Sequence, residues 1–463
     1  MSENRSFCIH GHFYQPPRDD IFTGKIPQEP GAAPYRNWND RVLETCYRPN
    51  ATLRNYSKLS FNIGPTLADW MAKESPEVLK KIVDEDEVNQ AIYGAGNAIA
   101  QPFNHRILPL ANSADKCTQV KWGITAFESV FGRHPEGMWL PETAVDMETL
   151  SILANENIVF TILAPWQVEV IEGNSPYIVE LGNGRSIVVF VYHGALSSTM
   201  SFDTFATGNA DAFAEFYIKP EIDRYNPEQL ILIATDGELY GHHQPFRDQF
   251  LAHLMNGAVK GIGLKQTWPA SWLKHHEVKG RARITENTSW SCHHGVERWQ
   301  NDCGCTPHGA WKSPLKKGFD ALNEDIFADY CILMQAYGFD PIRVRDEYIR
   351  VELGLIVFEE WLNNLADHPV RPEEQQKIKC ALETQFTCQK MFTSCGWFFD
   401  DLARLEPQNN IRFAAHGAAL MNEITGKDYS EKVVPLLKEA VSENTKQSAA
   451  DDFLLAYSRF LSL

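Results

Sequence analysis

The chain has 463 residues, 44% hydrophobic and 22% charged, which excludes disordered and fibrous proteins and leaves room for a large domain plus a second one. Its 60 acidic and 43 basic residues give a formal net charge of −17, which argues against non-specific binding to nucleic acid or to anionic membranes. A neutral substrate such as a sugar polymer is not repelled by such a surface.

The N-terminus is polar, without an apolar signal region, and no stretch approaches the roughly 18 apolar residues of a membrane span. Ten cysteines are too few for a disulfide scaffold in a chain of this size. We therefore expect a cytoplasmic protein with no membrane partner, whose cysteines are mostly reduced thiols.

Over about the first 290 residues, short apolar runs alternate with longer amphipathic stretches, which predicts parallel strands joined by right-handed crossovers. Between the strands, Val120, Ile124 and Phe127 recur at helical spacing, and Asp146 is the expected N-cap of a helix that buries Leu150. The pattern fits a β/α barrel, with an open doubly wound sheet as the competitor. The expected strands are residues 7–12, 59–63, 90–93, 137–140, 159–163, 187–192, 229–234 and 282–286.

From about Pro314 the strand-like runs disappear and long helical patterns follow, separated by prolines. We therefore expect a barrel domain over residues 1–310 and a C-terminal helical bundle over residues 311–463. The expected helices are residues 322–337, 344–362, 372–399, 411–425, 431–444 and 449–461.

Polar clusters follow the ends of several predicted strands, and in a parallel barrel these ends meet at one face. We therefore expect clusters that are scattered over the sequence to share one pocket. They are His10 with His12, residues 97–105, Glu142, residues 236–243, and His293 with His294.

Two carboxylates in these clusters are the candidate catalytic residues. Glu142 closes a short apolar run beside Trp139, whose ring could pack against a sugar; the alternative is that Glu142 caps the following helix. Asp236 opens a polar run directly after a buried strand, where unpaired charge is destabilising and is usually networked or functional. Glycosidases need one carboxylic acid to protonate the leaving oxygen and a second carboxylate to attack or to activate water, and this pair could supply both.

Two further segments suit a binding site but leave their role open. His10 and His12, two apart on the first strand, point the same way, and they could bind a divalent metal, bond to sugar hydroxyls or be satisfied core histidines. The loop with Asn104 and His105 is suited to substrate positioning, or is an ordinary solvated loop.

The region after Trp290 is rich in cysteine and histidine. Residues 292–305 suggest zinc, but the usual spaced Cys-x-x-Cys pair is absent, so we favour an aromatic, thiol-lined wall of the pocket. In the helical part, Ser394, Trp397 and Asp400 interrupt a helix; the aromatic residues there are mostly core, but these three could reach a neighbouring site.

Taken in order, these segments resemble glycoside hydrolase family 57, the α-glucan-active family of amylases, branching enzymes and 4-α-glucanotransferases. Residues 10–16 look like its first motif, although Phe13 and Tyr14 intervene where the family commonly has a compact His-Gln-Pro. Residues 139–142 look like the motif that ends in the catalytic nucleophile, and residues 236–243 like the motif that opens with the acid/base. The loop 104–109 and the segment 394–400 also have counterparts in relatives.

The resemblance implies an incomplete, seven-stranded β/α barrel, a helical domain that closes over the active site, a retaining mechanism and no obligatory cofactor. Glu142 would attack the anomeric carbon and Asp236 would protonate the departing oxygen, with their carboxyl groups roughly 5–5.5 Å apart. Burial and the nearby charge of Glu238 should raise the pKa of Asp236. The residues expected to bind the oligo- or polysaccharide substrate are His10, His12, Gln15, Asn104, His105, Trp139, Glu238, His242, His243, Trp290, Trp397 and Asp400.

Two other functions stay open. A glycan-binding protein without catalysis would not need both Glu142 and Asp236. A metal-dependent carbohydrate hydrolase, such as a polysaccharide deacetylase or a zinc α-mannosidase, would place metal ligands at the ends of strands. Its candidate ligands are His10, His12, Asp236 and His242.

Overall fold

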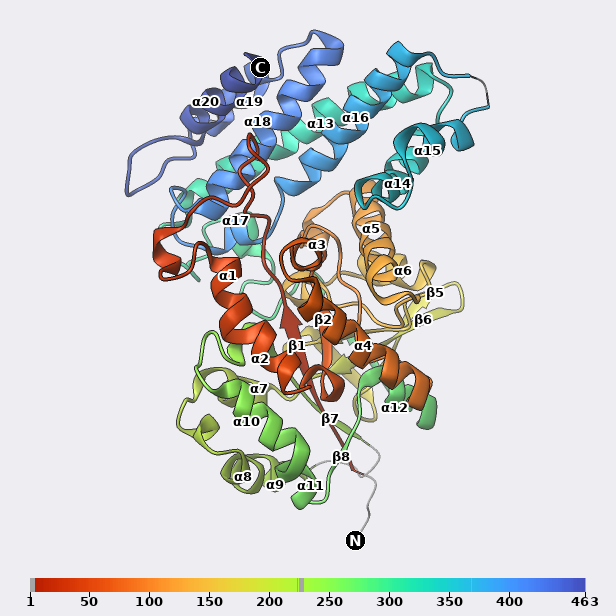
Figure 1. The fold of residues 1–463 in the computed structure, drawn as a ribbon, viewed down its shortest axis with the longest axis vertical. Coiled ribbons are helices and arrows are strands. Elements are labelled where there is room, and N and C mark those ends of the chain that lie inside the picture. Colours follow the sequence, from red (N-terminus) through yellow and green to blue (C-terminus); the bar gives the residue numbers. More distant parts are fainter. Residues whose placement is uncertain (1–4, 223, 225–228, 368, 463) are drawn as a thin grey trace. The chain divides into compact units, whose positions relative to one another are not determined.

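The computed structural model describes residues 5–222, 224, 229–367 and 369–462 (Figure 1). The first four residues, part of the N-terminus in which no signal region was recognised, lie outside this range. The chain forms two compact units, each built from three segments. Unit 1 comprises Met1–Pro17, Pro27–Pro102 and Val130–Trp290, and unit 2 comprises Arg18–Ile26, Phe103–Ser129 and Ser291–Leu463.

The strands of unit 1 form two sheets among the described residues. The first has the order β2-β1-β7 with β8 also paired to β1, and all its pairs are parallel. The second has the order β3-β6-β5-β9-β4 and mixes parallel and antiparallel pairs. The strands are β1 Ser6–Phe13, β2 Ser60–Ile63, β3 Phe160–Leu163, β4 Val168–Glu172, β5 Tyr177–Gly182, β6 Arg185–Val191, β7 Leu230–Asp236, β8 Lys265–Gln266 and β9 Gly280–Ile284.

Isolated pairings extend the parallel arrangement beyond the first sheet. Three parallel bridges join Phe61 to Ala98, Ala100 to Met138, and Gly137 to Phe160. The backbone N–H of His193, just after β6, donates to the carbonyl of Leu232 in β7 at 2.6 Å. These contacts link the two sheets, and the predicted α/β class is confirmed.

Helices lie between the strands of unit 1 and make up most of unit 2 (Figure 1). Those of unit 1 are α1 Trp38–Val42, α2 Arg48–Thr52, α3 Pro65–Glu74, α4 Pro76–Tyr93, α6 Met147–Asn155, α7 Gly194–Phe202, α8 Ala210–Phe213, α9 Lys219–Ile222, α10 Arg247–His253, α11 Val259–Gly261 and α12 Pro269–His275. Those of unit 2 are α5 Ser113–Phe131, most of which belongs to it, α13 Lys312–Ala336, α14 Pro341–Glu352, α15 Phe358–Leu365, α16 Pro372–Lys390, α17 Cys395–Phe398, α18 Leu405–Thr425, α19 Ser430–Leu437 and α20 Ala449–Leu461. None of the described helices is both long and apolar enough to span a membrane.

The core of unit 1 surrounds β1 and β7. Strand β1 is buried along its whole length, and β7 is buried except at its last residue, Asp236. Both faces of these strands are covered, which explains why their sequences are nearly continuous apolar runs rather than alternating ones.

The predicted strands differ from the structure in three ways. Residues 137–140 form isolated parallel bridges at Gly137 and Met138 rather than a continuous strand. The predicted strand at residues 90–93 is wrong, because these residues form the last turn of α4, which Gly94 ends in the left-handed conformation. Ile92 is 66% exposed there, so the apolar run that suggested a strand lies on the helix surface. Strands β4, β5 and β8 were not predicted. Four of the five residues of β4 are exposed, so it lacks a buried apolar pattern, and β8 has only two residues.

In unit 2 the predicted helices are present, but two are divided, and the one predicted at residues 431–444 ends at Leu437. Residues 344–362 fall into α14 and α15, with Gly354 at a φ of 67° between them, and residues 372–399 fall into α16 and α17. The predicted domain boundary at residue 310 also differs from the units. Unit 2 begins its last segment at Ser291 and includes residues 103–129, where Asp115 pairs with Arg345 of α14 at 2.8 Å.

Candidate active site

Two histidines of β1 make buried hydrogen bonds to side chains of the neighbouring strand β2. His10 Nδ1 lies 2.9 Å from Ser60 Oγ, and its Nε2 lies 3.2 Å from Asn62 Oδ1. The amide nitrogen of Asn62 lies 3.0 Å from His12 Nδ1. Burial lowers the pKa of His10 to about 3 and that of His12 to about 4, so both imidazoles are neutral. The amide oxygen of Asn62 also lies 3.2 Å from His12 Nδ1, so this side chain orients the ring of His12.

Both histidine rings stack on Trp139. The ring centroids are 4.7 Å apart for His10 and 5.3 Å apart for His12, with interplanar angles of 16° and 21°. Trp290 meets Trp139 edge-on at 5.0 Å. We call these four residues the aromatic cluster. The indole N–H of Trp139 is buried and has no hydrogen-bond partner within the described part of the chain, which leaves one donor of the cluster unsatisfied.

Glu142 is attached to the aromatic cluster through Trp290. The indole Nε1 of Trp290 donates to Glu142 Oε2 at 2.9 Å, and its backbone N–H donates to the Glu142 carbonyl at 3.0 Å. The alternative interpretation of Glu142 as a helix cap is wrong. Asp146 caps α6, as predicted, because its Oδ1 accepts the backbone N–H of Thr149 at 2.7 Å.

The backbone that carries Glu142 is strained. Glu142 and the β-branched Thr143 have φ values of 56° and 50°, in the left-handed region that costs a non-glycine residue about 1–3 kcal/mol. Gln167 holds this conformation: it accepts from Thr143 Oγ1 at 2.8 Å and donates to the Thr143 carbonyl at 2.7 Å. Strain that is maintained by buried hydrogen bonds is typical of functional sites, and here it fixes the orientation of Glu142.

Asp236 ends β7 and pairs with His12 in the register of the parallel sheet. Its side chain keeps solvent-accessible surface, but the surrounding protein displaces much of its hydration, and this burial raises its pKa to about 6. A carboxyl with this pKa remains partly protonated at mildly acidic pH. This state is the one that a general acid requires.

Glu238 lies two residues beyond Asp236 and is buried. It accepts hydrogen bonds from the Tyr47 hydroxyl at 2.6 Å and from the Tyr14 backbone N–H at 3.0 Å. Burial raises its pKa to about 8; the charge of Asp236 adds to this effect, and the hydrogen bonds oppose it. Glu238 is therefore neutral while Asp236 titrates. The expectation that its charge raises the pKa of Asp236 is wrong, because burial is the cause.

Three other residues of unit 1 that were predicted to bind substrate have separate contacts. His242 Nδ1 lies 3.1 Å from Thr45 Oγ1, and burial lowers the pKa of His242 to about 4. His243 is exposed, and the carbonyl of Gln15 accepts a hydrogen bond from Thr66 Oγ1 at 2.6 Å. A role of these residues in binding stays a prediction.

Two families match parts of the sequence. Residues 13–284 match the family described as glycosyl hydrolase family 57, and residues 308–455 match a family described as a domain of unknown function, DUF3536. The chain belongs to glycosyl hydrolase family 57. The family 57 match includes Glu142 and Asp236, whereas His10, His12 and Trp290 lie just outside it.

Solved structures with the same fold include three carbohydrate-active enzymes. An exo-type maltose-forming amylase from Pyrococcus sp. ST04 aligns with a TM-score of 0.71 and 16% identity, over 94% of this chain and 82% of that one. A family 57 branching enzyme from Pyrococcus horikoshii aligns with a TM-score of 0.64 and 14% identity, over 99% of this chain and 95% of that one. A 4-α-glucanotransferase from Thermococcus litoralis aligns with a TM-score of 0.57 and 13% identity, over 91% of this chain and 60% of that one. No curated protein matches the sequence. At these identities the likeness shows a shared family 57 fold.

The metal ligands expected for a rival hydrolase do not converge in this family 57 chain. Among the described residues, His10, His12, Asp236 and His242 form no group that could hold a metal ion. Both ring nitrogens of His10 already face side chains of β2.

Unit 2 carries the remaining residues that were predicted to bind substrate. Asn104 is buried and accepts a hydrogen bond from Gln119 Nε2 at 2.9 Å, and His105 Nδ1 lies 2.6 Å from Ser394 Oγ. The pairing of His105 with Ser394 joins two segments that sequence analysis had singled out separately.

The aromatic residues that follow Ser394 pack in the interior of unit 2. Trp397 is 2% exposed and contacts Phe319 edge-on at 5.7 Å. Asp400 is exposed, and its carbonyl accepts a hydrogen bond from Trp311 Nε1 at 3.4 Å. Packing accounts for the position of Trp397, and a contact of either residue with substrate stays a prediction.

Sequence analysis did not single out Asn62, Gln167 or Tyr47. Asn62 orients His12, Gln167 holds the turn of Glu142, and Tyr47 binds Glu238. Each is a single polar residue in an ordinary setting. The one available signal was the placement of Asn62 inside a predicted strand, where a buried amide needs a partner.

Proposed function

We propose that this chain is a retaining enzyme that cleaves or transfers α-glycosidic bonds of α-glucans, with Glu142 as nucleophile and Asp236 as acid/base. The observation that carries the proposal is that side-chain contacts in unit 1 lead from Glu142 to the strand position beside Asp236. Trp290 binds Glu142 and contacts Trp139, which stacks on His12, and the backbone of His12 is paired with that of Asp236 in the β1–β7 register. The similar structures are named as an amylase, a branching enzyme and a glucanotransferase, which supports an α-glucan substrate.

In the first step the Glu142 carboxylate attacks the anomeric carbon. Asp236, protonated, gives its proton to the glycosidic oxygen, so the bond breaks and a glycosyl ester of Glu142 forms. In the second step Asp236 takes a proton from water or from a sugar hydroxyl. That oxygen then displaces Glu142, and the two inversions give net retention. The neutral imidazole of His12, next to Asp236 in the register of the sheet, is suited to hydrogen-bond with a sugar hydroxyl beside Asp236.

The backbone pairing supports the finer description of the fold that this mechanism uses. We infer a seven-stranded barrel made of β1, β2, the segments around Ala100 and Met138, β3, β6 and β7. Isolated parallel bridges connect β2, the segments around Ala100 and Met138, and β3. The backbone hydrogen bond from His193 to Leu232 connects the end of β6 to β7. In such a barrel Glu142 and Asp236 both follow the C-terminal ends of strands, where active sites are built.

The first test is incubation with maltoheptaose and with amylose, followed by chromatography of the products. Shorter sugars alone indicate hydrolysis, and longer sugars as well indicate transfer. Glu142→Gln and Asp236→Asn should each lower the rate by about 10²–10⁴-fold. Glu169→Gln and Asp211→Asn, which change exposed carboxylates of unit 1, are the matched controls and should leave it unchanged.

Azide distinguishes the two roles. With α-glucosyl fluoride and azide, Glu142→Ala should form the β-glucosyl azide, because azide then attacks in a single inversion. Asp236→Ala should form the α-glucosyl azide, because Glu142 still makes the covalent intermediate. Exchange of these two products would reverse the assignment, and full activity of either variant on amylose would refute it.

A further inference from the structure

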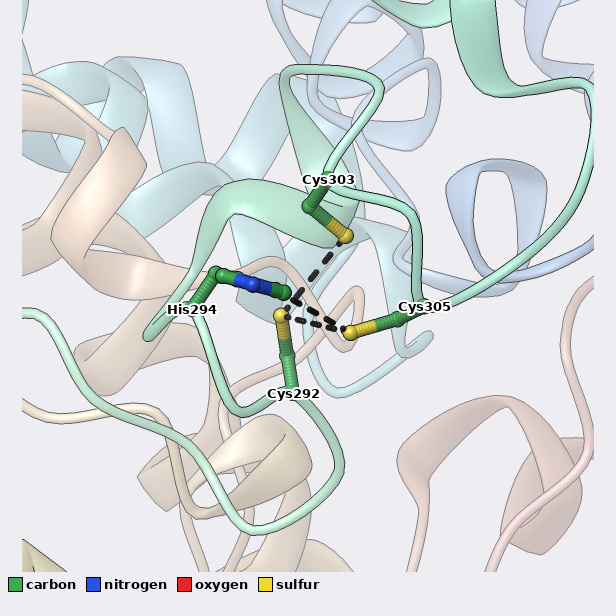
Figure 2. A group of neighbouring side chains, drawn as sticks. All are labelled: Cys292, His294, Cys303 and Cys305. Atoms are coloured by element: carbon green, nitrogen blue, oxygen red, sulfur yellow. Dashed lines mark hydrogen bonds between the residues drawn. The ribbon is translucent and has the colours of Figure 1, made fainter.

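Four side chains of unit 2 that offer metal ligands point toward one another in the loop that begins at Ser291 (Figure 2). Each offers one ligand atom, and the four atoms lie within 4.8 Å of one another. Among the described residues, no other group of three or more such side chains converges in this way. The four are Cys292, His294, Cys303 and Cys305.

Three distances between ligand atoms match those of a tetrahedral site. A Zn–S distance of about 2.3 Å places two sulfur ligands about 3.8 Å apart, and a Zn–N distance of about 2.0 Å places sulfur and nitrogen about 3.5 Å apart. Cys292 Sγ lies 3.8 Å from Cys303 Sγ and 3.7 Å from Cys305 Sγ, and Cys305 Sγ lies 3.4 Å from His294 Nδ1. A disulfide would bring two sulfurs to about 2.05 Å, so these thiols are arranged around a common centre rather than bonded in pairs.

We propose that unit 2 binds one structural zinc ion through Cys292, His294, Cys303 and Cys305. Three thiolates and one imidazole complete a tetrahedral shell without an open position, which is the composition of structural zinc sites rather than catalytic ones. The ion therefore supplies no step of the glycosidic reaction.

The groups around the cluster suit a bound cation with three thiolates. Zinc with three thiolates carries one net negative charge. The buried Arg298 donates to the Cys305 carbonyl at 3.3 Å, and the buried Lys312 lies in the same region, bonded to Thr306 Oγ1 at 3.0 Å. These two cations can balance that charge.

The site also explains how this loop keeps one conformation. From Cys292 to Cys305 the only regular structure among these residues is the single turn Glu297–Trp299. Metal bonds at both ends of the loop remove conformational freedom that so little regular structure cannot remove. Arg298 then lies over the ring of Phe398 at 4.3 Å and attaches the loop to α17. The cluster lies between the two family matches, so neither match assigns it.

The test compares two adjacent exposed histidines, only one of which faces the cluster. The full chain is purified under reducing conditions, and its zinc is measured by mass spectrometry of the metals and by competition with a chromophoric chelator. We expect about one zinc per chain. His294→Ala should lower the zinc affinity by at least about ten-fold, because loss of a ligand exceeds the loss of a second-shell partner. His293→Ala and Cys331→Ser, which leave all four ligands in place, should bind zinc as the wild type does.

A second measurement keeps the test independent of folding defects. The wild-type protein is depleted of metal and titrated with Co²⁺, which should give the visible absorption of tetrahedral cobalt with thiolate charge-transfer bands at one equivalent. Added zinc should abolish these bands. Equal zinc affinity of the two histidine variants, an iron-sulfur chromophore in the purified protein, or a disulfide among the three thiols would each overturn the proposal. None of these readouts depends on the catalytic carboxylates, so this proposal and the proposed function can fail separately.

Discussion

Each unit buries a carboxylate, and the pKa values of the two carboxylates are shifted in opposite directions. Asp115 of unit 2 is paired with Arg106 at 2.9 Å and with Arg345 at 2.8 Å. Burial alone would raise its pKa, but the two guanidinium groups outweigh this effect and lower it. Glu238 of unit 1 has neutral partners, the hydroxyl of Tyr47 and a backbone N–H, and its pKa is raised to about 8.

The comparison separates two uses of a buried acid. Paired with cations, Asp115 stays ionised and joins helices of unit 2, which is a structural role. Without such pairing, Glu238 and the neighbouring Asp236 keep their protons to unusually high pH. Raised pKa values of this kind are typical of sites that move protons, and this favours unit 1 as the place of the chemistry.

The largest effect on stability is expected from Asp115→Asn. It leaves Arg106 and Arg345 buried without their paired carboxylate, which should lower the free energy of unfolding of unit 2 by about 3–5 kcal/mol. Calorimetry at neutral pH would measure it. Glu347→Gln, which removes an exposed i,i+4 partner of Arg343, is the control and should cost less than about 1 kcal/mol. Equal losses would show that the buried network is no stronger than a surface pair.

Glu238→Gln should instead stabilise unit 1, by on the order of 3 kcal/mol near pH 8. Glu238 loses its proton at about pH 4.5 when unfolded and at about pH 8 when folded. Wild-type stability therefore falls as the pH rises through this window, and glutamine removes that loss while keeping an acceptor for Tyr47. Denaturant unfolding at pH 5 and pH 8 checks this. If the difference in free energy of unfolding between variant and wild type does not grow from pH 5 to pH 8, the raised pKa of Glu238 is contradicted.

Glu142 also accepts a hydrogen bond from a neutral donor, the indole of Trp290. Removal of this donor should have a smaller effect than the two substitutions above. Trp290→Phe deletes the N–H bonded to Glu142 Oε2 and keeps an aromatic ring, and we expect kcat/KM to fall about ten-fold. Trp166→Phe is the matched control, because the indole of Trp166 donates to a backbone carbonyl, that of Ser289. A similar fall in both variants would show that the bond to Glu142 has no special role in orienting it.

Most of the fold could be predicted because its signals are local. Buried strands such as β1 and β7 are continuous apolar runs, and the helices of unit 2 have clear periodicity. Predictions failed where an apolar run was short, as at residues 90–93, or where a strand was exposed, as in β4. Residues 103–129 belong to unit 2, where Asp115 forms an ion pair with Arg345, and no periodicity reveals such a contact.

The sequence motifs of the candidate site could be predicted, but the residues that hold these motifs in place could not. His10, Glu142 and Asp236 stand in runs whose composition packing does not explain. Gln167 is a lone polar residue whose role depends on a turn 24 positions away in sequence. Residues 292–305 were not predicted to bind zinc because they lack a Cys-x-x-Cys pair. The ligands instead form two pairs, Cys292 with His294 and Cys303 with Cys305, each separated by one residue, and the loop brings the two pairs together.

The smallest effect is expected on the pH dependence of activity. Because burial raises the pKa of Asp236 to about 6, kcat/KM for maltoheptaose should fall as the pH rises above about 6, where the acid loses its proton. Glu238 is still neutral at that pH, so Glu238→Gln should leave this limb where it is, even if the absolute rate changes. A pH–rate profile of both proteins at low substrate concentration measures the limb. A downward shift of about one unit in the variant would show that Glu238 is charged in the active enzyme, and the contrast with Asp115 would then rest on Asp236 alone.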